Sequence, residues 1–143
     1  MRPVDAQDPL DRAAAAYEQA VFGGDGTAVA DGAAHLDLLE AGLALARGRL
    51  AHARFLGSSR TDTYDRGLFD RAVDLYRAHG DVRGEAEATF WLATYHQVVL
   101  GDHDTAEPLL RRADDLATKA GDDLTRSYAL RHLCFVAQHH DQP

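Results

Sequence analysis

Histidines and adjacent carboxylates are the side chains of this chain that could do chemistry. Among eight histidines, His132, His139 and His140 recur at positions i, i+7 and i+8. Zinc-binding helices use pairs at i, i+3 or i, i+4 together with a carboxylate, and this spacing departs from that pattern. The aspartate pairs at 114–115 and 122–123 are neighbours in sequence, so on a helix they point about 100° apart. Neither group predicts a metal site or an acid–base pair.

Enzyme motifs are absent from the sequence. It has no nucleophile elbow, no phosphate-binding loop ending in Lys-Ser/Thr, and no dinucleotide fingerprint. The glycine-rich stretch 23–32 follows no predicted strand, so it indicates a flexible loop, and no cofactor is expected. One alternative stays open, a small-molecule-binding or catalytic pocket built from His52, Tyr95, His96 and Arg54.

Composition excludes several classes of protein. The formal net charge of −8 over 143 residues, with no basic stripe, argues against nucleic-acid binding. The single cysteine, Cys134, excludes an intrachain disulfide, and its apolar neighbours predict a core residue instead of a reactive thiol. No apolar run is long enough for a signal peptide or a membrane span. These observations predict a cytoplasmic protein without a membrane partner.

The elements that must position these residues are marked by a repeated Gly-Asp pair. Gly-Asp occurs at 80–81, 101–102 and 121–122, each time between two helix-forming segments. Glycine suits the left-handed residue that ends one helix, and aspartate suits the cap that begins the next. Such short connections make neighbouring helices antiparallel. We therefore expect helices at 64–79, 83–100, 103–120 and 123–140, the second with apolar residues on all sides and packed between neighbours.

The first half of the chain is less regular. Asp8, followed by a proline, predicts the start of a helix that ends before the loop at 23–32. A helix of about 36 Å, at 1.5 Å per residue, is then expected over 33–56, followed by a loop at 57–63. Gly42 and Gly48 weaken this helix because glycine has low helix propensity.

One helix is written twice, 41 residues apart. Residues 68–81 and 109–122 share seven identities in fourteen positions, and the similarity continues in the same register beyond them. A helix pair that cannot bury its apolar face alone is stabilised by stacking on a copy of itself. The pattern predicts an all-α fold, an antiparallel helix-pair α-solenoid of about six helices. The whole chain, 1–143, is read as one domain, with a helix and loop in 1–32 and repeats in 33–143.

The repeat resembles the tetratricopeptide repeat, in its longer, kinesin-light-chain-like variety of about 40–42 residues. Ala106, Leu110 and Ala113 match the pattern of the second helix of that repeat, and Phe69 and Ala72 match it in the upstream copy. An ordinary six-helix bundle is the alternative fold.

The resemblance implies a binding protein whose concave groove is lined by the first helix of each repeat. A groove that combines arginines with aromatic rings suits an acidic or aromatic segment of a protein or peptide. Similar domains are attached to bacterial regulators, which suggests a role in signalling. The residues at matching positions are Arg47, Leu50, Arg54, Ala88, Trp91, Tyr95, His132 and Val136.

The last predicted helix has no partner helix after it. Leu130, Cys134 and Phe135 would then form an exposed apolar face, which soluble monomers avoid. We expect this face to dock on a second copy, giving a homodimer, on another partner, or on a continuation of the chain. A homodimerisation domain without a ligand is therefore a third hypothesis for the function.

Overall fold

A computed structural model describes residues 8–58 and 67–142, and these residues form six α-helices and no strand. The expectation of an all-α fold is confirmed. None of the described helices is long and apolar enough to cross a membrane. The helices are α1 (Pro9–Val21), α2 (Thr27–Ser58), α3 (Gly67–Ala78), α4 (Val82–Thr94), α5 (His103–Ala120) and α6 (Asp123–His140), and α4 continues as a π-helical turn, η1 (Tyr95–Val99).

The Gly-Asp pairs do end and begin helices. Gly80, Gly101 and Gly121 have φ angles of 66°, 66° and 69°, in the left-handed region that glycine occupies at low cost. The aspartate after each glycine caps the next helix by accepting a hydrogen bond from the backbone N–H three residues on, at 2.9–3.2 Å. The predicted ends of α4, α5 and α6 therefore follow from local chemistry.

Helix α2 is longer than expected, because it begins at Thr27 and not at residue 33. The carboxylate of Asp25 accepts a hydrogen bond from the N–H of Thr27 at 3.1 Å, which caps the helix early. Gly32, expected in the loop, is a buried helical residue packed against Ala16 of α1. The 32-residue helix spans about 48 Å. Of the predicted loop at 57–63, the first two residues are helical, and the remainder lies outside the described residues, as do residues 64–66.

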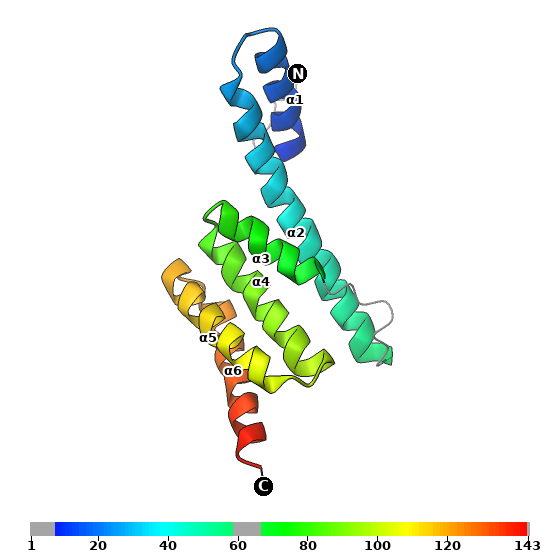
Figure 1. The fold of residues 1–143 in the computed structure, drawn as a ribbon, viewed down its shortest axis with the longest axis vertical. Coiled ribbons are helices and arrows are strands. Elements are labelled where there is room, and N and C mark those ends of the chain that lie inside the picture. Colours follow the sequence, from blue (N-terminus) through cyan, green and yellow to red (C-terminus); the bar gives the residue numbers. More distant parts are fainter. Residues whose placement is uncertain (1–7, 59–66, 143) are drawn as a thin grey trace.

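Helix α2 joins two parts of the molecule. Its first half pairs with α1, and this hairpin projects away from α3–α6, whereas α3 packs against its second half (Figure 1). From α3 onwards each helix packs on the next, and α6 also contacts α4.

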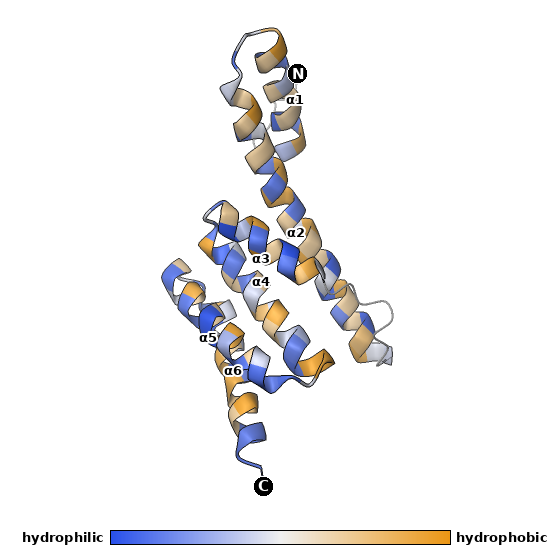
Figure 2. Ribbon diagram, in the orientation of Figure 1, coloured by the Kyte–Doolittle hydropathy of each residue, from blue (hydrophilic) through white to orange (hydrophobic). Residues whose placement is uncertain are grey.

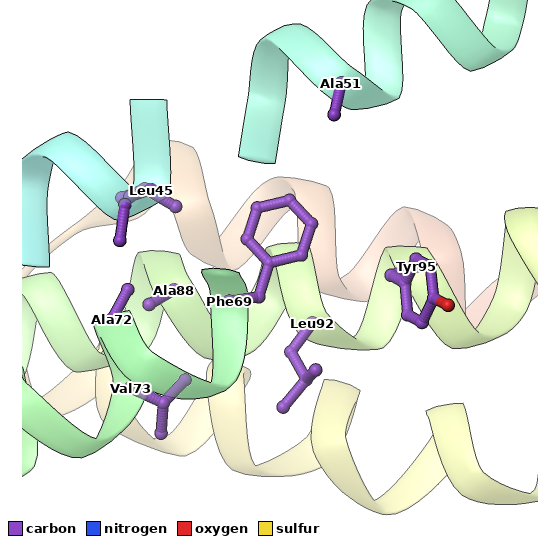
Figure 3. Close-up of a cluster of buried hydrophobic side chains, with 9 residues drawn as sticks. Leu45, Ala51, Phe69, Ala72, Val73, Ala88, Leu92 and Tyr95 are labelled. Carbon is purple, nitrogen blue, oxygen red and sulfur yellow. The ribbon is translucent and has the colours of Figure 1, made fainter. Parts of the chain in front are cut away.

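The interior consists of two apolar clusters that share α4. Figure 3 shows the first cluster, which α2, α3, α4 and Tyr95 of η1 form around Phe69. The second, around Leu110, joins α4, α5 and α6. Because α4 contributes to both, it is packed on several sides, as its all-round apolar pattern predicts.

Positions 41 residues apart have matching burial. Phe69 and Leu110 are 1% and 0% exposed, and Ala88 and Ala129 are both 0% exposed. Ala72 and its counterpart in α5 are also fully buried. The repeated residues thus occupy equivalent places in the two clusters.

One buried carboxylate connects three helices. Glu85 of α4 accepts hydrogen bonds from Arg77 of α3 at 3.0 Å and from Arg112 of α5 at 2.7 Å. Burial by itself raises the pKa of Glu85, but the hydrogen bonds and charges of the two guanidinium groups outweigh it, and the pKa lies below its ordinary value. The ionised carboxylate therefore ties α3 and α5 to α4.

Candidate functional site

Two open hollows meet at Trp91 on the side of the molecule where α2, α4 and α6 lie. The first, the α4–α6 groove, has a volume of about 330 Å³ and is lined by Arg49, Arg83, Glu87, Phe90, Trp91, Asp122, Leu124, Thr125 and Tyr128. The second, the α2 hollow, has a volume of about 530 Å³ and a mostly apolar lining, which consists of Ala46, Arg49, Leu50, His52, Ala53, Leu56 and Trp91. Volumes of about 300–1,000 Å³ are usual for ligand sites.

Trp91 is held in place by rings on several sides. Its indole stacks on Phe69 with ring centroids 6.3 Å apart, and it meets the rings of His52 and Phe90 edge-on at 5.5 and 5.4 Å. The guanidinium of Arg49 lies 5.3 Å from the centroid of the indole, a cation–π distance. A half-buried aromatic side chain that is already fixed loses little conformational entropy when it binds a partner.

The rim of the α4–α6 groove carries two loosely paired arginines. Arg49 lies 3.4 Å from Glu87, and Arg83 lies 3.8 Å from Asp122. Both distances exceed those of strong charge-assisted hydrogen bonds, and both arginines are at least half exposed. Their guanidinium groups therefore keep donors that can reach a carboxylate on a ligand.

The exposed apolar part of this groove comes from α6. Leu124 and Tyr128 are 63% and 40% exposed, and the ring of Tyr128 stacks on buried Phe90 with centroids 5.8 Å apart. Neither residue was predicted in the groove from the sequence. The 41-residue register places Tyr128 opposite Glu87 of α4, and this correspondence could have indicated both.

The structure separates the eight predicted groove residues into two groups. Arg47, Leu50 and Arg54 are exposed on α2, while Trp91 and His132 are half-buried. The other three, Ala88, Tyr95 and Val136, are at most 4% exposed and belong to the interior clusters. For these three the expectation of a direct ligand contact is corrected, because α3, α5 and α6 cover the sides of α4 and η1 on which the clusters form.

His132 takes part in a polar contact that the sequence does not reveal. The amide of Gln97, buried in η1, donates to the backbone carbonyl of His132 at 3.1 Å, and its oxygen accepts from Nδ1 of the same histidine at 2.6 Å. The π-helical turn adds a residue to the helical repeat at this point, marked by a hydrogen bond from the N–H of Leu100 to the carbonyl of Tyr95. No residue pattern signals this turn.

Stability is expected to fall as the pH is lowered from about 7.5 to 5.5. Burial lowers the pKa of His52 and His132 below the ordinary 6.5, so the unfolded chain binds more protons than the folded one in this range. Each such proton lowers the free energy of unfolding by about 1.4 kcal/mol per pH unit where the difference is complete. Denaturant titrations across the range test this, and His132→Gln should reduce the slope. An equal slope in the variant would contradict the assignment.

The remaining histidines contact different parts of the molecule. His139 stacks on His103 with ring centroids 3.9 Å apart, and Nε2 of His140 lies 3.4 Å from Asp104. Among the described residues, no group of three or more His, Cys, Asp or Glu side chains is placed to hold a metal ion. Of the histidines in the alternative pocket, His52 packs on Trp91 whereas His96 packs on Tyr95.

The predicted dimer face lies on the exposed side of α6. Leu130 and Phe135 are 42% and 47% exposed, and Cys134 is exposed as well. The prediction that Cys134 is a core residue is therefore wrong. Helices α4 and α5 pack against the other side of α6, which carries Ala129 and Val136, and no described helix covers the side of the cysteine.

Comparisons with models of known protein families, with curated proteins and with solved structures gave no match. The site therefore has to be interpreted from its own geometry.

Proposed function

We propose that the chain is a protein- or peptide-binding module built from tetratricopeptide-like helix pairs. The matching burial of positions 41 residues apart supports the repeat. The observation that carries the binding role is the α4–α6 groove, in which an immobilised tryptophan, an exposed tyrosine and two loosely paired arginines face solvent. Aromatic residues and arginine are the types that dominate binding energy at protein interfaces.

The partner that fits this groove is an extended segment carrying an aromatic or large apolar side chain next to a carboxylate. The apolar side chain would pack between Trp91 and Tyr128, and the carboxylate would take the donors of Arg83. The negative charge of the whole protein opposes an acidic partner at long range. Recognition therefore has to come from short-range contacts inside the groove.

Binding of acidic, phenylalanine-containing peptides is expected to change the fluorescence of Trp91, the single tryptophan of the chain. A panel of such synthetic peptides is titrated beside a panel in which lysine replaces glutamate. Arg83→Ala and Tyr128→Ala should each weaken binding about tenfold, the effect of losing one interface anchor. Arg111→Ala, which removes an exposed arginine outside the groove, is the matched control. Equal binding of the two panels, or no effect of the groove variants, would contradict the proposal.

A further inference from the structure

The outer face of α2 is apolar along the whole helix. Its larger residues lie seven positions apart, at 29, 36, 43 and 50, and are between 37% and 60% exposed. Figure 2 shows hydrophobic residues recurring from the pairing with α1 to the C-terminal end of α2. We name this surface the α2 stripe, and it consists of Val29, Leu36, Leu39, Leu43, Ala46, Leu50 and Ala53. A heptad spacing of this kind is the pattern by which two helices pair.

The other side of α2 already holds the helix in the fold. Ala41, Leu45 and Gly48 are buried against α3 and α4, whereas the α2 stripe points away from them. A helix with apolar residues on opposite sides is typical of burial between two neighbours. The fold supplies one of these neighbours.

We propose that the α2 stripe binds the α2 stripe of a second copy of this chain, with the two helices antiparallel about a two-fold axis. A stripe about 48 Å long and about 10 Å wide presents roughly 480 Å² on each copy. Tyr17 of α1 and Trp91 of α4 border hollows beside the stripe and extend the contact. The total approaches the ~800 Å² per partner of a specific interface.

The charges of α2 select a second copy in the antiparallel direction. All of its carboxylates precede all of its guanidinium groups, in the order Asp31, Asp37, Glu40, Arg47, Arg49, Arg54. Parallel pairing would set acidic half against acidic half. Antiparallel pairing sets each acidic half against a basic half, and the complementarity is largest for an identical chain.

The heptad positions define a register for this pairing. An axis beside Leu43 alternates large and small residues across the interface, so that the helices approach closely. The same axis brings Glu40 of one copy near Arg47 of the other. The opposed pairs are Leu43 with Ala46, Leu39 with Leu50, and Leu36 with Ala53 of the second copy.

The two apolar hollows beside the stripe lie at positions that this register uses. One hollow, of about 220 Å³, lies between α1 and α2 and includes Tyr17, Val29 and Leu36. The C-terminal half of α2 from the second copy passes over it. The α2 hollow at the other end receives the N-terminal half of that helix. The second copy covers Leu50 but leaves Leu124 and Tyr128 of the α4–α6 groove open, so this inference stands independently of the proposed ligand.

Light scattering over a concentration series tests the self-association. The intact chain is expected at twice its 15.6 kDa mass, and Leu43→Glu at the monomer mass with unchanged helical circular dichroism, because Leu43 is half exposed. Phe135→Glu, an equally exposed position on α6, should leave the dimer intact. A monomeric wild type would overturn the proposal. Splitting by Phe135→Glu, but not by Leu43→Glu, would also overturn it and assign the interface to α6.

Disulfide crosslinking tests the direction of the pairing, with Cys134→Ser as background. In the proposed register, two copies of Ala46→Cys are separated by about 4.5 Å along the axis, and two copies of Ala53→Cys by about 25 Å. Mild oxidation should therefore crosslink the first variant and not the second. A parallel pair would place both cysteines opposite their own copies. Crosslinking of Ala53→Cys to the same extent would overturn the antiparallel arrangement.

Discussion

Gly48→Ala is expected to lower the free energy of unfolding by about 2–3 kcal/mol, the range for overpacking a rigid core site. A Cβ atom at this position would lie less than 3.0 Å from three carbons of the Phe69 ring. That ring is 1% exposed and stacks on Trp91, so it has no room to withdraw. Helix propensity alone predicts the opposite sign, a gain of about 1 kcal/mol.

Gly42→Ala is the matched control, in the same helix. A Cβ there would have the hydroxyl of Tyr76 as its nearest neighbour, at an ordinary 3.6 Å. This variant is therefore expected to gain up to about 1 kcal/mol from helix propensity. Denaturant unfolding of both proteins decides the matter. A stabilised Gly48→Ala variant would mean that α2 and α3 do not approach as closely as the position of Phe69 requires.

The double variant Arg77→Ala/Arg112→Ala is expected to lose about 3 kcal/mol, the lower end of the range for a buried charge deprived of its partners. Glu85 would keep its negative charge in the contact between three helices with neither guanidinium to balance it. The lower end applies because both arginines are about half exposed and their removal admits water. Arg111→Ala, next to Arg112 but outside this contact, should change stability by less than about 0.5 kcal/mol.

Charge is distinguished from packing by two further measurements. Glu85→Gln in the double-variant background should recover part of the loss, because a neutral amide costs less to bury than a carboxylate. The loss should also shrink as the pH falls towards 4. In the wild type the low pKa of Glu85 gives stability that is present above the unfolded pKa of about 4.5 and is lost as the pH falls through the folded value. A loss that is independent of pH, with no recovery by glutamine, would show that only packing was removed.

Much of the fold was predictable because its signals are local. The ends of α4, α5 and α6 depend on a glycine and an aspartate within four residues of each other. The start of α2 was missed although its signal is local too, since Asp25 caps Thr27. Four glycines in ten residues were given more weight than this cap, and Gly32 is helical because Ala16 of α1 leaves no space for a side chain there.

The candidate site was less predictable because exposure is a property of neighbouring helices. Trp91, Leu50 and the two predicted arginines of α2 reach the surface, but Tyr95 at an equivalent register position is buried. The π-helical turn that begins at Tyr95 shifts the helix by one residue and turns Gln97 towards His132. A hydrogen-bond shift of this kind has no compositional signal.

By itself the sequence determined the helical class, most helix ends, and the set of side chains that repeat every 41 residues, because these depend on capping chemistry and apolar periodicity along one chain. The tertiary structure alone decided which apolar residues remain exposed on α2 and α6, why Gly48 has no side chain, and how Glu85 is neutralised. Those features are set by distances between atoms that are far apart in sequence. Such distances exist only after the helices have packed.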